Sequence, residues 1–323
     1  MLVPRSRLAR VVCGAIAPIA LTVALLPAAR AHARATGPAT PVLAGAVAAP
    51  PVAPSLAVDG EELQGRSGKL LARFVAPTPR LELRYLARLF GDSAGRLPGA
   101  MITRSDAVGG RPFNLITLLP FSRKVGGRIG SYRMGFWPAE RGRRRSDAYA
   151  NPDGFIRVTP DNQATYISEH FRLADFLTKD QRSVWPKYLV LREDLVDKLE
   201  LVITELESQG VSVKHMQVMS GFRTPQYNQR GVGAGGRAQD SRHQYGDAAD
   251  VFVDNDRDGR MDDLNGDGRV DSRDAAALVA AVEQVERRYP DLVGGAGVYR
   301  ATSVHGPFAH IDVRGRRARW GSA

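Results

Sequence analysis

Cysteine is nearly absent from this chain of 323 residues, in which Cys13 is the only one. A single cysteine excludes an internal disulfide and any zinc site built from several cysteines. A metal site in this protein must therefore use the six histidines and the carboxylates.

A long apolar run is also missing near the N-terminus, because the stretch 11–26 is shorter than the ~20 residues that a membrane span needs. Three arginines and no acidic residue precede this stretch, and small-residue cleavage sites follow it. We interpret residues 1–35 as a secretory signal peptide, with a membrane anchor as the alternative. Cleavage would remove Cys13 and leave an exported protein of the periplasm or cell envelope, without a stable membrane anchor.

Acidic residues are outnumbered, with 34 Asp and Glu against 45 Lys and Arg, for a net charge of +11. Removal of residues 1–35 takes away five arginines and leaves 11 − 5 = +6. Arginine clusters at 141–145 and 314–319 can attract an anionic polymer, and a solvated charged face is the alternative for each cluster. For an exported protein we expect cell wall or membrane surface as that polymer, and no nucleic acid.

Charge is absent between residues 36 and 54, and we interpret residues 36–60 as an Ala/Pro-rich linker. Residues 61–157 follow with short alternating runs at 80–85, 113–119 and 130–137, separated by glycine turns. This pattern predicts a small β-rich accessory domain, for which we expect a role in placement or wall binding.

The rest of the chain, residues 158–323, mixes two kinds of periodicity. Apolar residues at helical spacing predict a helix over 192–209, which ends at Gly210, and an acidic first turn opens a second helix over 272–288. Strands are predicted at 213–220, 249–253, 296–300 and 308–313. We therefore expect an α+β fold with a small antiparallel sheet and flanking helices.

Two segments of this region carry metal-binding residue types. His243 and Asp250 lie seven residues apart across Gly246, and His310 lies on a short apolar run that reads as a strand. Three protein ligands leave one tetrahedral position for water, as in catalytic zinc sites. The pattern predicts a hydrolase; the alternative is that His243 only caps a loop and Asp250 only ends a strand.

The pattern Ser-x-His-x-x-Gly-x-Ala-x-Asp, at residues 241–250, with a later histidine on the last strand, resembles a known family. It is similar to the zinc D-alanyl-D-alanine carboxypeptidases and murein endopeptidases that trim bacterial peptidoglycan, and most similar to the endopeptidases. Residues 220–228 resemble the arginine-bearing loop of that family, and the likeness covers roughly residues 165–320. It implies zinc bound by His243, Asp250 and His310, with peptidoglycan as the partner.

Zinc lowers the pKa of its bound water toward ~7, but a base must still take the proton. The carboxypeptidase branch has a glutamate three residues before the last histidine, where this chain has Pro307. Asp312 is the first candidate base; it can instead orient a zinc ligand, and His305 is the second candidate. The resemblance implies that Arg223 binds a substrate carboxylate or stabilises the oxyanion, with a surface salt bridge as the alternative.

An acidic insertion over 254–274 contains two patterns of alternating oxygen ligands with glycine at the sixth place, as calcium loops have. The second pattern resembles a dockerin-type EF-hand loop. The expected calcium ligands are Asp254, Asp256 and Asp258 in the first loop, and Asp263, Asn265, Asp267, Asp271 and Asp274 in the second. Because the two loops share residues 263–265, we expect one calcium rather than two.

Taken together, these features predict an exported zinc metallopeptidase that hydrolyses peptidoglycan stem peptides next to a D-amino acid. Murein endopeptidase action is favoured over D,D-carboxypeptidase action. The alternative is a non-catalytic wall-binding protein that retains the zinc peptidase fold.

Overall fold

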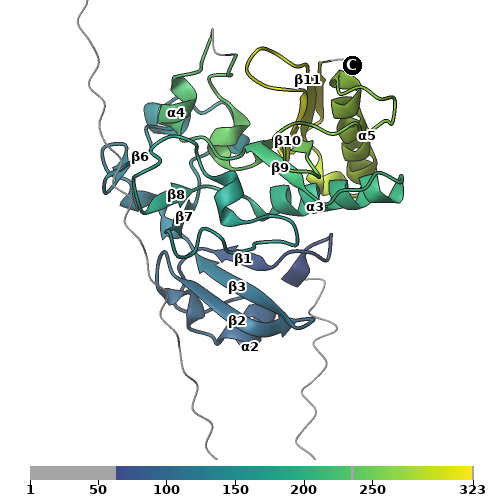
Figure 1. Cartoon of the computed structure of the whole chain (residues 1–323). Coiled ribbons are helices and arrows are strands. Elements are labelled where there is room, and N and C mark those ends of the chain that lie inside the picture. The colour runs from purple at the N-terminus through teal and green to yellow at the C-terminus, as the bar shows by residue number, and fades with distance from the viewer. Residues whose placement is uncertain (1–62, 234–235, 322–323) are drawn as a thin grey trace, which may run out of the picture. The chain divides into compact units, whose positions relative to one another are not determined.

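The structure is a computed structural model and describes residues 63–233 and 236–321. These residues form helices and several small sheets (Figure 1). The predicted α+β class is confirmed. The predicted signal peptide, Cys13 and the linker lie outside the described residues. Within these residues, no helix has the length and apolar character to cross a membrane.

A five-stranded sheet carries the metal-binding motifs, with the strand order β13-β11-β12-β10-β9. All neighbours are antiparallel except β11 and β13, which run parallel. The strands are β9 (Met216–Ser220), β10 (Ala248–Val253), β11 (Gly295–Tyr299), β12 (Phe308–Asp312) and β13 (Ala318–Trp320). The four strands predicted for this region are confirmed, and β13 was not predicted.

Two long helices, α3 (Glu193–Ser208) and α5 (Ser272–Arg288), pack together beside this sheet, as Figure 1 shows. The apolar positions Leu195, Leu199 and Leu206 of α3 are buried, and each contributes roughly 1.5–3 kcal/mol of burial free energy. Both predicted helices are confirmed. Gly210 follows α3 with φ 85°, a conformation that glycine adopts without strain.

The N-terminal part of the described chain has a three-stranded sheet of β1 (Ala72–Val75), β2 (Met101–Val108) and β3 (Arg111–Thr117). The strand predicted at 80–85 is wrong, because α2 (Arg84–Phe90) begins there. Leu81 and Tyr85 are buried, whereas Leu83 between them is 44% exposed. A strand would have placed all three on one face, so the apparent alternation came from a loop that leads into a helix.

Short strands connect this sheet to the rest: β4 (Leu119–Pro120), β7 (Gly154–Val158) and β8 (Lys187–Leu189) form a second three-stranded sheet. The strand predicted at 130–137 is reduced to β6 (Tyr132–Arg133), which pairs with β5 (Arg128–Ile129).

The boundary predicted between residues 157 and 158 falls inside β7. Phe155 and Ile156 belong to the same hydrophobic core as α3, α5 and the five-stranded sheet, so no break in the core marks that boundary.

Candidate metal centre

Strands β10 and β12 place two of the three predicted zinc ligands. Asp250 lies directly opposite His310 in this antiparallel pair, so their side chains leave the sheet on the same face. His243 lies in the short helical turn Arg242–Tyr245, which ends at Gly246. Gly246 has φ +66°, and a Cβ there would lie 2.3 Å from the backbone oxygen of Val190. Glycine is therefore required for the turn that directs His243 toward the sheet.

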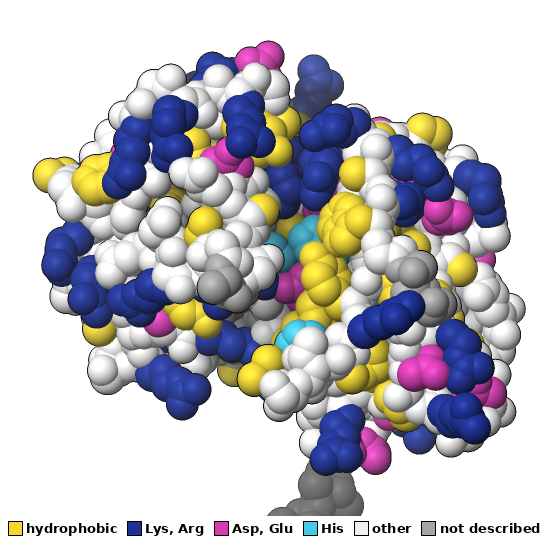
Figure 2. Space-filling view, turned by 90° about the horizontal axis from the view of Figure 1, so that it is seen from above, with side chains coloured by type: hydrophobic (Ala, Val, Ile, Leu, Met, Phe, Trp, Pro, Cys, Tyr) yellow, Lys and Arg dark blue, Asp and Glu magenta, His cyan; other side chains and the backbone are white. Residues whose placement is uncertain are grey.

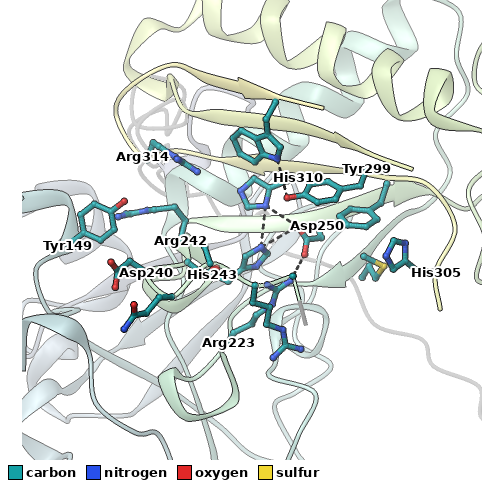
Figure 3. A pocket seen from close by; sticks show the side chains of 18 of the residues that line it. Tyr149, Arg223, Asp240, Arg242, His243, Asp250, Tyr299, His305, His310 and Arg314 are labelled. Atoms are coloured by element: carbon teal, nitrogen blue, oxygen red, sulfur yellow. Dashed lines mark hydrogen bonds and ion pairs between the residues drawn. The ribbon is translucent and has the colours of Figure 1, made fainter. Parts of the chain in front are cut away.

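The donor atoms of the three predicted ligands converge on one point (Figure 3). Asp250 Oδ1 lies 3.2 Å from His243 Nε2 and 2.9 Å from His310 Nδ1. The two histidine nitrogens are 3.2 Å apart. Donors at about 2.0–2.1 Å from a tetrahedral zinc are separated by about 3.3 Å, so these spacings fit such an ion.

Each histidine is held by its other ring nitrogen. Nδ1 of His243 donates to the backbone oxygen of Gly221 at 2.7 Å, and Nε2 of His310 donates to Asp312 Oδ2 at 3.1 Å. When the rings are neutral, these hydrogen bonds leave the lone pairs on His243 Nε2 and His310 Nδ1, the two atoms that face Asp250. A carbonyl or carboxylate behind the ring is the usual support of a metal-binding histidine.

Arg223 holds the second oxygen of Asp250. Its Nη2 donates to Asp250 Oδ2, and its Nε donates to Ser220 Oγ at 2.8 Å. The Arg223 side chain is only 13% exposed. The alternative of a surface salt bridge therefore does not fit, because the ion pair with Asp250 is largely buried, whereas the role of Arg223 toward a substrate stays a prediction.

The three ligands share strong electrostatic coupling. Burial raises the pKa of Asp250, but the neighbouring His243 and His310 outweigh it and hold that pKa well below its usual range. Burial also lowers the pKa of His243. For His310, hydrogen bonds to Asp250 and Asp312 outweigh burial and raise the pKa to about 9. Asp250 is thus kept as a carboxylate, the form that a metal ion binds.

Asp312 does not fit the general-base role that was its first interpretation. Its carboxylate is fully buried and accepts hydrogen bonds from Arg314 Nε, at 2.9 Å to each oxygen, and from the backbone N–H of Gly295 at 2.7 Å. Burial raises its pKa, but His310 and Arg314 outweigh this and hold it far below the usual range. The geometry favours its second role, the orientation of His310.

His305 lies on the loop between β11 and β12 and lines the same cleft as the metal ligands. Its Nδ1 donates to the backbone oxygen of Gly306 at 2.8 Å, which leaves the lone pair of the neutral ring on Nε2. The ring contacts Phe308 edge-on with centroids 5.0 Å apart. Of the two candidate bases, Asp312 and His305, only His305 therefore keeps an available acceptor atom in the cleft.

The cleft above the metal ligands has a volume of about 860 Å³. Figure 2 shows histidine and acidic side chains at the bottom of this hollow, beside a ridge of hydrophobic side chains. Seven arginines line it against two aspartates, so its field favours anions. They are Arg145, Arg223, Arg237, Arg242, Arg300, Arg314 and Arg316, against Asp240 and Asp250.

Sequence reasoning missed an aromatic wall of the cleft, formed by Tyr299, Phe308 and Trp320. Tyr299 and Phe308 are cross-strand partners, and their rings stack with centroids 4.5 Å apart. Trp320 donates from Nε1 to the hydroxyl of Tyr299 at 3.0 Å. Aromatic residues at the ends of two adjacent predicted strands were the available signal for this wall.

The first calcium pattern brings carboxylates together: Asp254, Asp256 and Asp262 have oxygens within 4.8 Å of one another. Asp262, at the ninth place, was not among the predicted ligands. Asp258 is not in this group, although its backbone N–H donates to Asp254 and Asp256.

The second calcium pattern shows no such group in the described residues. Asp267 and Asp271 pair with Arg273 instead. Asp274 is fully buried, and its carboxylate accepts the backbone N–H groups of residues 264, 265 and 271. Asp263 and Asn265 also accept backbone N–H groups of their own loop. In this loop Asp271 and Asp274 therefore fix the entry into α5.

The centre thus combines two imidazoles and a carboxylate at metal-binding distances, an arginine on the carboxylate, and a basic cleft open to one side. Such a set can hold a divalent cation and polarise a bound carbonyl or water. Neither a protein-family model nor a curated protein nor a solved structure matches this chain.

Proposed function

We propose that this protein is an exported zinc metallopeptidase that hydrolyses peptidoglycan stem peptides next to a D-amino acid. The observation that carries the proposal is the convergence of His243, Asp250 and His310 at the floor of an open cleft. Zinc held by these three donors would supply a Lewis acid and would lower the pKa of water enough for nucleophilic attack at neutral pH.

The residues around the ion divide the remaining work. Asp312 and Gly221 fix the ring orientations of His310 and His243 through 3.1 and 2.7 Å hydrogen bonds. Arg223 neutralises the far oxygen of Asp250 and brings a positive charge to the place where the carbonyl oxygen of a substrate develops negative charge. Nε2 of His305, which lines the same cleft, would be the group that accepts a proton from water at the ion.

The substrate class follows from the cleft and from the likeness of residues 241–250 to murein endopeptidases. Stem peptides carry several carboxylates, which suit a cleft with seven arginines. The hollow in Figure 2 opens widely to the surface, as a cross-linked mesh requires. A carboxypeptidase needs a closed end, so endopeptidase action on cross-links is the favoured form.

A non-catalytic wall-binding protein is the second candidate. It is favoured by one observation: Pro307 takes the place of the family's glutamate, and the buried Asp312 cannot replace it. Digestion of purified peptidoglycan separates the two candidates. The peptidase releases peptides with the wild type and none with His243→Ala, whereas a binder releases none with either.

We further propose one calcium ion in the first acidic loop, at Asp254, Asp256 and Asp262. Oxygen ligands at the first, third and ninth places of a loop with glycine sixth match the requirements of calcium. Asp254 directly follows β10, the strand that carries Asp250, so the ion would stiffen the end of that strand.

A further inference from the structure

A smaller hollow of about 390 Å³ adjoins the metal cleft and shares part of its lining. The shared residues are Arg145, Tyr149, Arg242, Arg314 and Arg316. No aspartate or glutamate is among the described residues that line it. This hollow is thus a basic extension of the cleft that His243, Asp250 and His310 line.

The hollow joins the two arginine clusters that lie about 170 residues apart in sequence. Arg145 comes from the segment before β7, whereas Arg314 and Arg316 come from the loop between β12 and β13. Figure 3 shows Arg314, Arg242 and Tyr149 grouped on one side of the metal ligands. Convergence on one hollow distinguishes these arginines from a dispersed charged face.

Not every guanidinium in the hollow is available to a ligand. The guanidinium of Arg242 already has partners within the protein, because it pairs with Asp247 and donates to the backbone oxygen of Ala148 at 2.5 Å. Among the described residues Arg145 pairs only through Nε, which lies 2.8 Å from Asp240 Oδ2. Its two terminal nitrogens remain for a ligand.

Arg314 and Arg316 supply further donors. Arg314 binds Asp312 through Nε and Nη2, and its Nη1 makes no hydrogen bond among the described residues. Since Asp312 fixes the guanidinium, Nη1 keeps one direction and loses little freedom when it binds a ligand. The side chain of Arg316 is exposed and has no ion-pair or hydrogen-bond partner in the described chain.

We propose that this hollow is a carboxylate subsite, in which Arg145, Arg314 and Arg316 bind an acidic group of the substrate away from the scissile bond. The inference rests on the proposed function, because the substrate is the stem peptide that reaches the metal. Guanidinium groups bind carboxylates through paired, charge-assisted hydrogen bonds. The subsite would select stem peptides with a free carboxylate over those in which it is amidated.

The test uses a cross-linked stem-peptide dimer with free carboxylates and the same dimer with those carboxylates converted to carboxamides. Binding to the zinc-loaded protein is measured by calorimetry, and turnover is measured separately. The proteins are the wild type, Arg316→Gln, the double variant Arg145→Gln/Arg316→Gln, and Arg287→Gln as a control. Arg287 is an exposed arginine of α5 that does not line the cleft.

We expect the wild type and Arg287→Gln to bind the carboxylate dimer at least about tenfold more tightly than the carboxamide dimer, the effect of one charge-assisted hydrogen bond. Arg316→Gln should reduce this preference, and the double variant, which keeps only Arg314, should reduce it further. Equal binding of both dimers by the wild type, or an unchanged preference in the double variant, overturns the subsite. If the wild type shows the preference in binding but cleaves neither dimer, the subsite stands and the peptidase proposal fails.

Discussion

Asp312 and Asp250 contact opposite nitrogens of the same imidazole, His310. Asp312 accepts from Nε2 at 3.1 Å, and Asp250 lies 2.9 Å from Nδ1. His310 therefore lies between a buried carboxylate that orients its ring and the point where a metal would bind.

This arrangement predicts that Asp312→Asn weakens zinc binding by about 10–100-fold, the usual cost of losing the partner behind a metal-binding histidine. Competition with a chromophoric chelator measures the affinity, and a melting curve shows whether the variant is folded. A folded variant with wild-type zinc affinity would refute the orienting role of Asp312.

Proton transfer is predicted to depend on His305. His305→Gln should retain zinc and lose about 10²–10⁴-fold in kcat, the usual contribution of a general base. Zinc content and peptide release are measured on the same preparation. Full turnover in this variant would remove His305 from the mechanism.

The turn at Gly246 is predicted to depend on its close approach to Val190. Gly246→Ala places a Cβ 2.3 Å from the Val190 oxygen at φ +66°, and we expect a loss of about 2 kcal/mol or more in the free energy of unfolding. Gly142→Ala is the matched control, because Gly142 has φ +68° and open space around it. Urea unfolding of both variants separates the cost of the contact with Val190 from the cost of backbone strain. Equal losses in the free energy of unfolding would show that the contact with Val190 is unimportant.

The partly buried ion pair of His170 and Glu200 predicts a pH dependence of stability away from the metal centre. The hydrogen bond to Glu200 outweighs burial and raises the pKa of His170 above its usual value. Because the folded-state pKa exceeds the unfolded one, the stabilisation is fully present below pH ~6.5 and is lost as pH rises through the raised value. His170→Gln should therefore lower the melting temperature most at pH about 5.5, and less at pH about 9. A penalty that is constant over this range would argue against the charged pair.

Calcium is predicted to stabilise the protein through the first acidic loop. At a calcium concentration about 100 times Kd, binding should add about 2.7 kcal/mol, and a calcium-selective chelator should lower the melting temperature. Asp256→Asn should abolish this shift, whereas Asp267→Asn in the second loop should retain it. A shift lost only in Asp267→Asn would place the ion in the second loop, and no shift in the wild type would remove the ion altogether.

The convergence of His243, Asp250 and His310 could be predicted from the sequence because its signal is local. His243, Gly246 and Asp250 share one ten-residue motif, and the strand around His310 has a clear apolar pattern. The buried strands and the long helices are likewise confirmed, since their periodicity reflects the faces that they bury.

The roles of side chains that depend on tertiary contacts could not be predicted in this way. An aspartate such as Asp312 can serve as a general base. Only its contacts with Arg314 and Gly295 show that its buried carboxylate already accepts hydrogen bonds. Asp274 fits a calcium loop by position, yet it binds backbone N–H groups at the start of α5. The spacing of residues along the chain does not show which neighbouring groups already donate hydrogen bonds to a carboxylate oxygen.

The central claim is that His243, Asp250 and His310 bind one divalent metal ion. The most direct measurement is the zinc content of the purified protein by elemental analysis, together with calorimetric zinc titration of the metal-free wild type, Asp250→Asn and His310→Ala. We predict one zinc per chain in the wild type and an affinity loss of more than about a hundredfold in each variant, beyond the cost of losing a supporting residue. Absence of zinc binding in the wild type, or undiminished binding in folded variants, would contradict the account.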